Sequence, residues 1–217
     1  AIQTVRIRGQ AMQDAVPVGT GSMVAIMGLD DSSVIKACHD MQELARTDGG
    51  LKDCVIEAAN FNCPGQVVVS GHQKALDYLK ANLKAENYGG TRLKILPLAV
   101  SAPFHSSLMK PAAERLKGQL EKVKWNPKMA FDVIHNVSSE TNRDGLRVKD
   151  LLFAQMTKPV LWTSSVHRAS ALGAQHFVEF GAGRVLSGLV KKIAHDAHTL
   201  NVDTIENLKK TISELNA

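Results

Sequence analysis

The amino-terminal segment carries small or apolar residues at helical spacing. These residues recur at every third or fourth position: Ile2, Val5, Gly9, Met12 and Val16. That period is typical of one face of a helix, so a helix is predicted within residues 1–18. No capping residue or signal segment precedes it. We therefore expect this helix to belong to a longer protein and to pack against a segment that precedes it.

The pattern then changes and predicts a βαββαβ unit over residues 19–98. Apolar runs and alternating positions predict strands at residues 23–29, 55–59, 66–70 and 92–98. Helical spacing predicts one helix that begins at Asp31 or Ser32 and another over residues 72–85. The Asn, Pro and Gly residues between positions 60 and 65 predict the connection of a hairpin. This order of elements is that of a ferredoxin-like arrangement.

Residues 99–217 alternate between helical and extended patterns. Helices are predicted at residues 107–123, 148–155, 162–172 and 185–193, and strands at residues 130–134 and 176–180. Alternating helices and strands are typical of a layered α/β body. The tail is expected to be helical from Asn201 and to pack on that body through an apolar face formed by Ile205, Leu208, Ile212 and Leu215.

Composition narrows the class of protein. The chain has 44% hydrophobic residues and a net charge of +5, which is ordinary for a globular protein. It has no run of about 18 apolar residues, so we expect no membrane insertion. Three cysteines without a C-x-x-C pair argue against a disulfide framework and a zinc site and favour the reducing cytoplasm. With two Tyr and two Trp, the chain has few large aromatic rings on which nucleic-acid bases could stack, so nucleic acid is not an expected partner.

One histidine and two arginines are candidates for chemistry. His105 lies where a predicted strand ends and a helix begins, a position from which a side chain can reach a cleft and act as a general base. The other interpretation is a loop histidine that caps the helix or faces water. Arg6 and Arg8 flank the apolar stripe of the first helix equally, and the neighbouring Gly9 and Met12 favour Arg8 only slightly.

A catalytic histidine needs a group to activate, and the sequence contains no obvious one. No serine or cysteine lies in a Gly-x-Ser-x-Gly type of elbow. Ser106 and Ser107 adjoin His105, but neighbouring side chains in a loop usually diverge. The eight histidines show no spacing typical of a metal site, so no metal is expected.

Several motifs, in order along the chain, resemble one family of enzymes. They are Arg8-Gly9-x-x-Met12-Gln13-x-Ala15-Val16-Pro17, Asn60-Phe61-Asn62-Cys63-Pro64-Gly65-Gln66, Phe104-His105-Ser106-Ser107-Leu108-Met109-Lys110-Pro111, Pro159-Val160-Leu161-Trp162-Thr163 and Gly181-Ala182-Gly183-Arg184. Together they resemble the carboxy-terminal two thirds of a malonyl-CoA:acyl-carrier-protein transacylase of bacterial type II fatty acid synthesis. The resemblance implies part of an α/β-hydrolase-like body, residues 1–18 and 99–217, with residues 19–98 inserted as a ferredoxin-like small subdomain.

The resemblance also implies roles for individual residues. A serine, absent from this chain, attacks the malonyl thioester, and His105 removes its proton as the general base. The backbone carbonyl of Gln155 orients that histidine, and Arg8 pairs with the free malonyl carboxylate. Phe104 restricts the space for the acyl group, and Met12 and Asn62 complete the expected substrate-binding set.

The same resemblance implies the partners of the reaction. They are malonyl-CoA, acyl carrier protein and the amino-terminal segment of the enzyme, and coenzyme A enters as part of the substrate without any further cofactor. Alone, this chain is expected to be inactive. Two alternatives remain open: a transferase for another acyl unit, and a non-catalytic module that docks carrier protein through Lys84, Lys110, Lys191 and Lys192.

Overall fold

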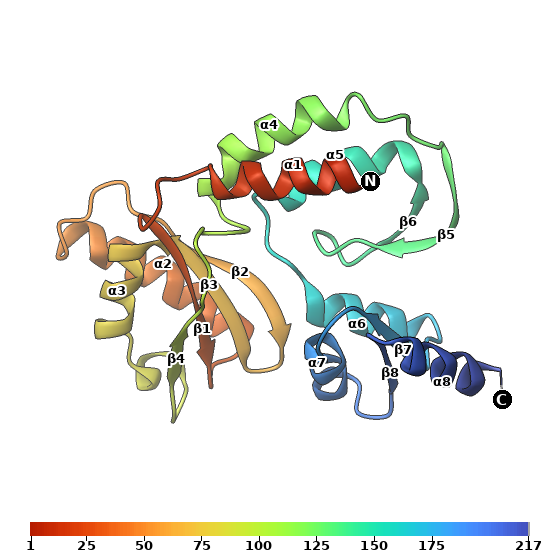
Figure 1. Ribbon diagram of the computed structural model, residues 1–217. Helices are drawn as coiled ribbons and strands as arrows, with labels where there is room; N and C mark the ends of the chain where they lie inside the picture. The colour runs from red at the N-terminus through yellow and green to blue at the C-terminus, as the bar shows by residue number, and fades with distance from the viewer. Residues whose placement is uncertain (217) are drawn as a thin grey trace.

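The computed structural model describes residues 1–216, which form a mixed α/β fold with three small sheets. Figure 1 shows three groups of elements: a four-stranded sheet with two helices, a layer of helices above it, and a carboxy-terminal group beside both. The candidate histidine lies in the segment that leads from the sheet to the helical layer.

The four-stranded sheet has the predicted order of strands and helices. Its strands have the order β2-β3-β1-β4, and every neighbouring pair is antiparallel. Helix α2 begins where Asp30 accepts a hydrogen bond from the Ser33 amide at 2.8 Å. The elements are β1 (Gly21–Met27), α2 (Asp31–Thr47), β2 (Ile56–Cys63), β3 (Gln66–His72), α3 (Gln73–Asn82), a short 3₁₀ helix η1 (Ala85–Tyr88) and β4 (Lys94–Pro97).

Both faces of this sheet are covered by side chains. Helices α2 and α3 pack on one face and form an apolar cluster that includes Val34, Ile26 and Leu76. Met23 and Val68 belong to a second cluster on the other face, the face toward the helical layer. A strand buried on both faces has few polar positions, which explains the nearly continuous apolar sequence of β1 and β3.

The predicted hairpin forms, but its connection is shorter than residues 60–65. Strand β2 continues to Cys63, and only Pro64 and Gly65 form the turn, with Gly65 at φ +74°. Phe61 and Cys63 are buried at alternate positions, so the strand continues because each side chain enters an apolar cluster. Two irregularities in its pairing with β3 bend the strand and leave Asn60 bridged to Val160.

The helical layer consists of α1 (Ile2–Gln13), α4 (Lys110–Leu120) and α5 (Gly145–Gln155). Their apolar faces meet in a cluster that includes Met12, Met109 and Leu116. The predicted helix over 107–123 begins as a short 3₁₀ turn, η2 (Ser107–Met109), before α4. A hairpin of β5 (Lys128–Ile134) and β6 (Thr141–Asp144) connects α4 to α5, and β6 was not predicted.

The carboxy-terminal group contains α6 (Trp162–Ala171), β7 (His176–Phe180), α7 (Val185–Ile193), β8 (His198–Val202) and α8 (Ile205–Leu215). Strands β7 and β8 are parallel. Asn201 lies in β8, so the prediction that the helical tail begins there is wrong, and the helix starts after Thr204 caps it.

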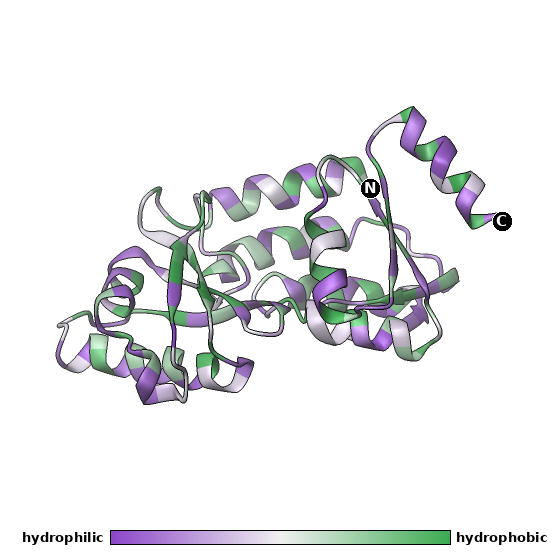
Figure 2. Ribbon diagram, turned by 90° about the horizontal axis from the view of Figure 1, so that it is seen from below, coloured by the Kyte–Doolittle hydropathy of each residue, from purple (hydrophilic) through white to green (hydrophobic). Residues whose placement is uncertain are grey.

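The expected packing of the tail helix is also wrong. Its apolar residues are 39–76% exposed, and the buried residue of α8 is Thr211. Because Thr204 caps the helix directly after β8, α8 lies against that strand through Thr211 and through a hydrogen bond between His198 and Glu214. Figure 2 shows α8 projecting from the rest of the fold with apolar segments uncovered.

Candidate active site

His105 lies in the loop between β4 and α4 and has an unusual backbone conformation. Its φ of +58° falls in the left-handed region, which a non-glycine residue seldom adopts. Nδ1 of its ring lies 2.9 Å from the backbone oxygen of Gln155. A carbonyl oxygen can only accept a hydrogen bond, so Nδ1 carries the proton and Nε2 keeps its lone pair. The ring is therefore held in the tautomer that a general base requires at Nε2.

Gln155 is the last residue of α5, and its position explains why its carbonyl is free. The final carbonyl groups of a helix have no partner within that helix. The Gln155 side chain folds back instead, and Nε2 donates to the backbone oxygens of Lys158 at 3.0 Å and Pro159 at 3.2 Å. The side chain thus fixes the turn after α5, and the main-chain oxygen accepts from His105.

The residues around His105 hold the loop tightly. Pro103 is buried against Gly21, where any Cβ would overlap the proline ring. Ser106 is fully buried, and its hydroxyl donates to the backbone oxygen of Pro103 at 2.7 Å. Ser107 hydrogen-bonds to Glu57. Both serines that follow His105 therefore have other partners, and neither is placed as its nucleophile.

Burial and charge both act on the histidine ring. Burial lowers the pKa of His105, and the positive charge of Arg8 lowers it further, whereas the hydrogen bonds that the ring donates to the backbone of Gln155 and Lys158 oppose that shift. The neutral form of His105 is therefore favoured near pH 7. A general base must be neutral to accept a proton, so these effects suit that role.

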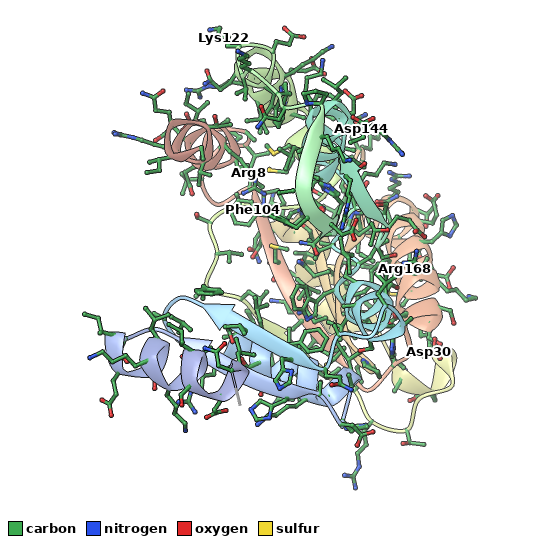
Figure 3. All side chains as sticks on the ribbon, turned by 90° about the vertical axis from the view of Figure 1, so that its right-hand side faces the viewer. Arg8, Asp30, Phe104, Lys122, Asp144 and Arg168 are labelled. Carbon is green, nitrogen blue, oxygen red and sulfur yellow. The ribbon has the colours of Figure 1, made fainter. Side chains whose placement is uncertain are left out.

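The structure distinguishes the two arginines of α1. Arg6 is exposed, whereas Arg8 is half-buried and burial lowers its pKa. The positive charge of Arg8 is one of the causes that lower the pKa of His105. Figure 3 shows Arg8 and Phe104 between α1 and the strands of the sheet. Arg8 is thus the arginine of this helix that can meet a ligand beside His105.

The other predicted substrate-binding residues lie in different surroundings. Phe104 packs against both the cluster of the helical layer and the cluster on the adjacent sheet face. Met12 is only 3% exposed and belongs to the former cluster. Asn62 is half-buried on β2. Phe104 and Met12 therefore contribute packing close to His105, whereas the structure brings Asn62 into no hydrogen bond with that site.

A cavity of about 550 Å³ opens on one side of His105. It is bordered by α2, by the outer edge of β2 and by the segment after α5, and its polar lining includes His105, Glu57, Ser107, Lys110, Thr157 and Lys158. Arg8, Met12, Asn62, Phe104 and Gln155 do not line it. His105 is therefore the one residue of the predicted site that borders this cavity.

Glu57 was missed by the sequence analysis. A single acidic residue in an alternating strand usually faces water, and no spacing connects it to His105.

Within residues 1–216, no three His, Cys, Asp or Glu side chains are grouped so that they could hold a metal ion. In the same range, no helix is both long and apolar enough to cross a lipid bilayer.

The fold and the site define a mixed α/β protein with a partly buried histidine oriented by a helix-terminal carbonyl. No family model matches the sequence. Over 193 residues, the chain is 42% identical to the malonyl CoA-acyl carrier protein transacylase of Escherichia coli (strain K12), covering 89% of this chain and 58% of the relative. It is 39% identical over 209 residues to that of Staphylococcus aureus (strain MSSA476), covering 96% and 64%.

Solved structures agree with these relatives. The malonyl CoA-acyl carrier protein transacylase of Clostridium perfringens superposes with a TM-score of 0.86 at 34% identity, covering 99% of this chain and 63% of that structure. A malonyl-transacylase in complex with its type II PKS acyl-carrier protein superposes with a TM-score of 0.85 at 35% identity, covering 98% and 64%. The chain is a homologue of the malonyl-CoA:acyl-carrier-protein transacylases, and it spans about six tenths of the length of these relatives.

Proposed function

We propose that this chain forms part of an enzyme that transfers a malonyl group from coenzyme A to the phosphopantetheine thiol of acyl carrier protein. The observation that carries the proposal is the oriented ring of His105, whose Nδ1 donates a hydrogen bond to the Gln155 carbonyl, so that Nε2 keeps its lone pair. Similarity to transacylases supports the choice of substrate and carrier. The three cysteines are free thiols, which supports a reducing, cytoplasmic setting for the reaction.

His105 acts as the base in both halves of the reaction. In the first half, Nε2 takes the proton of a serine hydroxyl, the serine oxygen bonds to the malonyl carbonyl carbon and the carbon–sulfur bond to coenzyme A breaks. The imidazolium then returns the proton to the coenzyme A thiolate. In the second half, Nε2 takes the proton of the carrier thiol, sulfur displaces the serine oxygen, and that oxygen recovers a proton from the ring.

Arg8 recognises the free carboxylate of the malonyl group in this proposal. A guanidinium binds a carboxylate through two parallel hydrogen bonds, and partial burial strengthens such a pair. Arg8 is half-buried and lies near His105, as this role requires. Phe104 limits the space beside the acyl group, Met12 supports Phe104 from below, and Asn62 contacts the bound thioester.

The proposal assigns each part of the chain to a subdomain. Residues 19–98 form a ferredoxin-like small subdomain, and residues 1–18 and 99–217 belong to an α/β-hydrolase-like large subdomain. The antiparallel strand order β2-β3-β1-β4 supports the first assignment. No Gly-x-Ser-x-Gly sequence occurs in the 217 residues, so the nucleophilic serine comes from a segment outside them.

The test is reconstitution of malonyl transfer. The chain is expressed with the part of the Escherichia coli transacylase that its alignment leaves uncovered, and malonyl carrier protein is measured by mass after addition of malonyl-CoA. The proposal expects transfer by the pair, none by either part alone, and loss of transfer in His105→Ala. Efficient transfer of acetyl but not malonyl groups would favour another acyl unit. Binding of carrier protein without any transfer by the pair would favour a docking module.

A further inference from the structure

Glu57 connects the sheet to the segment that follows His105. From β2, its Oε2 accepts a hydrogen bond from the Ser107 amide at 2.7 Å, and its Oε1 accepts one from the Ser107 hydroxyl at 2.7 Å. Ser107 is the second residue after His105 and the first residue of η2. One carboxylate therefore fixes both the main chain and the side chain of Ser107.

Glu57 supplies the hydrogen-bond acceptor that the residues next to Ser107 do not provide for its amide. Ser106 occupies the capping position before η2, but its side chain makes no capping hydrogen bond because its hydroxyl donates to Pro103. The amide groups at the start of a helix need acceptors, and a negative charge there is favourable. Without Glu57, the Ser107 amide would lose its acceptor at a partly buried position, and the segment after His105 would lose its attachment to β2.

Three contacts together fix the left-handed backbone conformation of His105. Pro103 packs on Gly21 before it, Glu57 binds Ser107 after it, and the Gln155 carbonyl binds its ring. A non-glycine residue keeps a left-handed conformation only when its surroundings fix it. We infer that Glu57 is a positioning residue, which holds the loop so that the ring of His105 keeps its hydrogen bond to Gln155 and the orientation of Nε2. The inference rests on the proposed function of His105 as the base.

The first readout is independent of acyl transfer. Long-range proton–nitrogen NMR spectra of the folded chain at pH 8 report which ring nitrogen of His105 carries the proton, and His105→Asn identifies its signals. Wild type should show one tautomer, with the proton on Nδ1. Glu57→Ala should give a mixture of tautomers, Glu57→Gln an intermediate result, and Ser107→Ala a smaller change, because one or more acceptor contacts remain in the latter two variants.

Glu179→Gln is the matched control. Glu179 accepts hydrogen bonds from the amide and hydroxyl of Ser187 at 2.8 and 2.7 Å, and also from the Leu186 amide at 3.1 Å, a similar arrangement in the first turn of α7. This variant should lose thermal stability to a similar degree as Glu57→Gln but leave the His105 signals unchanged. The positioning role would be wrong if Glu57→Gln, like Glu179→Gln, changed only the stability and left His105 in its single tautomer. Glu57→Gln has the size of the native residue and decides the question even if Glu57→Ala does not fold.

The second readout is kinetic and uses the reconstituted pair. Glu57→Ala should lower kcat roughly tenfold to a hundredfold, as expected for a misplaced catalytic group, while KM for malonyl-CoA changes by less than about twofold. Absence of transfer in wild type together with a tautomer change in the variants would reject the proposed function and retain the positioning role. Normal kcat in Glu57→Ala together with active wild type would reject the positioning role alone.

Discussion

Nδ1 of His105 and the backbone oxygen of Gln155 lie 2.9 Å apart, although 50 positions separate the two residues in the sequence. The contact joins the loop after the sheet to the end of a helix in the layer above. Its strength depends on the charge of the ring and on the burial around it. The predictions about pH dependence and about stability follow from this electrostatic environment.

The first prediction concerns the pH dependence of His105. Burial and Arg8 lower its pKa below the ordinary value of about 6.5, so the acid limb of malonyl transfer should lie below pH 6.5. Arg8→Lys keeps a positive charge and should leave the pKa of the His105 ring almost unchanged, whereas Arg8→Ala should raise that pKa. NMR titration of the ring measures the same pKa without turnover. A ring that titrates above pH 6.5 in wild type would contradict the prediction.

The same shift affects stability with a definite sign. The folded pKa lies below the unfolded pKa, so the folded state binds fewer protons between the two values. This contribution to stability is fully present above about pH 6.5 and is lost as the pH falls from there through the folded pKa. His105→Asn should therefore show a shallower loss of stability over that interval in denaturant unfolding, at pH values spaced between 4 and 8.

The second prediction separates the two arginines of α1. Arg8→Ala should abolish malonyl transfer by the reconstituted pair and leave acetyl transfer largely intact, because only malonyl has a carboxylate to pair. Arg8→Lys should recover a small part of the malonyl activity, since lysine cannot form the two parallel bonds. Arg6 is exposed on the same helix, and Arg6→Ala is the control that should change neither rate. Equal losses for both acyl groups in Arg8→Ala would argue against carboxylate pairing.

The third prediction concerns the buried hydroxyl beside His105. Ser106→Ala removes the donor to the Pro103 oxygen and leaves a buried carbonyl without that partner. The free energy of unfolding should fall by about 1–3 kcal/mol, measured by urea unfolding. Ser101 lies in the same loop but is exposed, so Ser101→Ala should cost much less. Similar losses for both variants would mean that burial does not set the cost.

Periodicity predicted helices such as α2, α3 and α4 because each has one face in an apolar cluster. It failed where burial came from distant contacts. Residues 60–63 have the composition of a turn, yet Phe61 and Cys63 enter two different clusters and keep β2 extended. Strand β8 was missed because its pairing with β7 is not visible in the local sequence. The amphipathic tail gave a correct helix, but its pattern could not show that the apolar face stays exposed.

In the site, too, the sequence predicted what depends on neighbouring residues and missed what depends on contacts between distant segments. The position of His105 between a strand and a helix was visible in the sequence, and resemblance to a family suggested Gln155 and Arg8 as its neighbours. Helical spacing alone could not separate Arg6 from Arg8, since burial depends on the packing of α1 on the rest of the fold. Glu57 gave no signal, because its partner Ser107 is distant in sequence and ordinary in type.

Phe104 packs against the sheet on one side and against the helical layer on the other, and it directly precedes His105. A substitution that shortens this side chain would therefore remove apolar contacts from two clusters at once, at the residue directly bonded to His105.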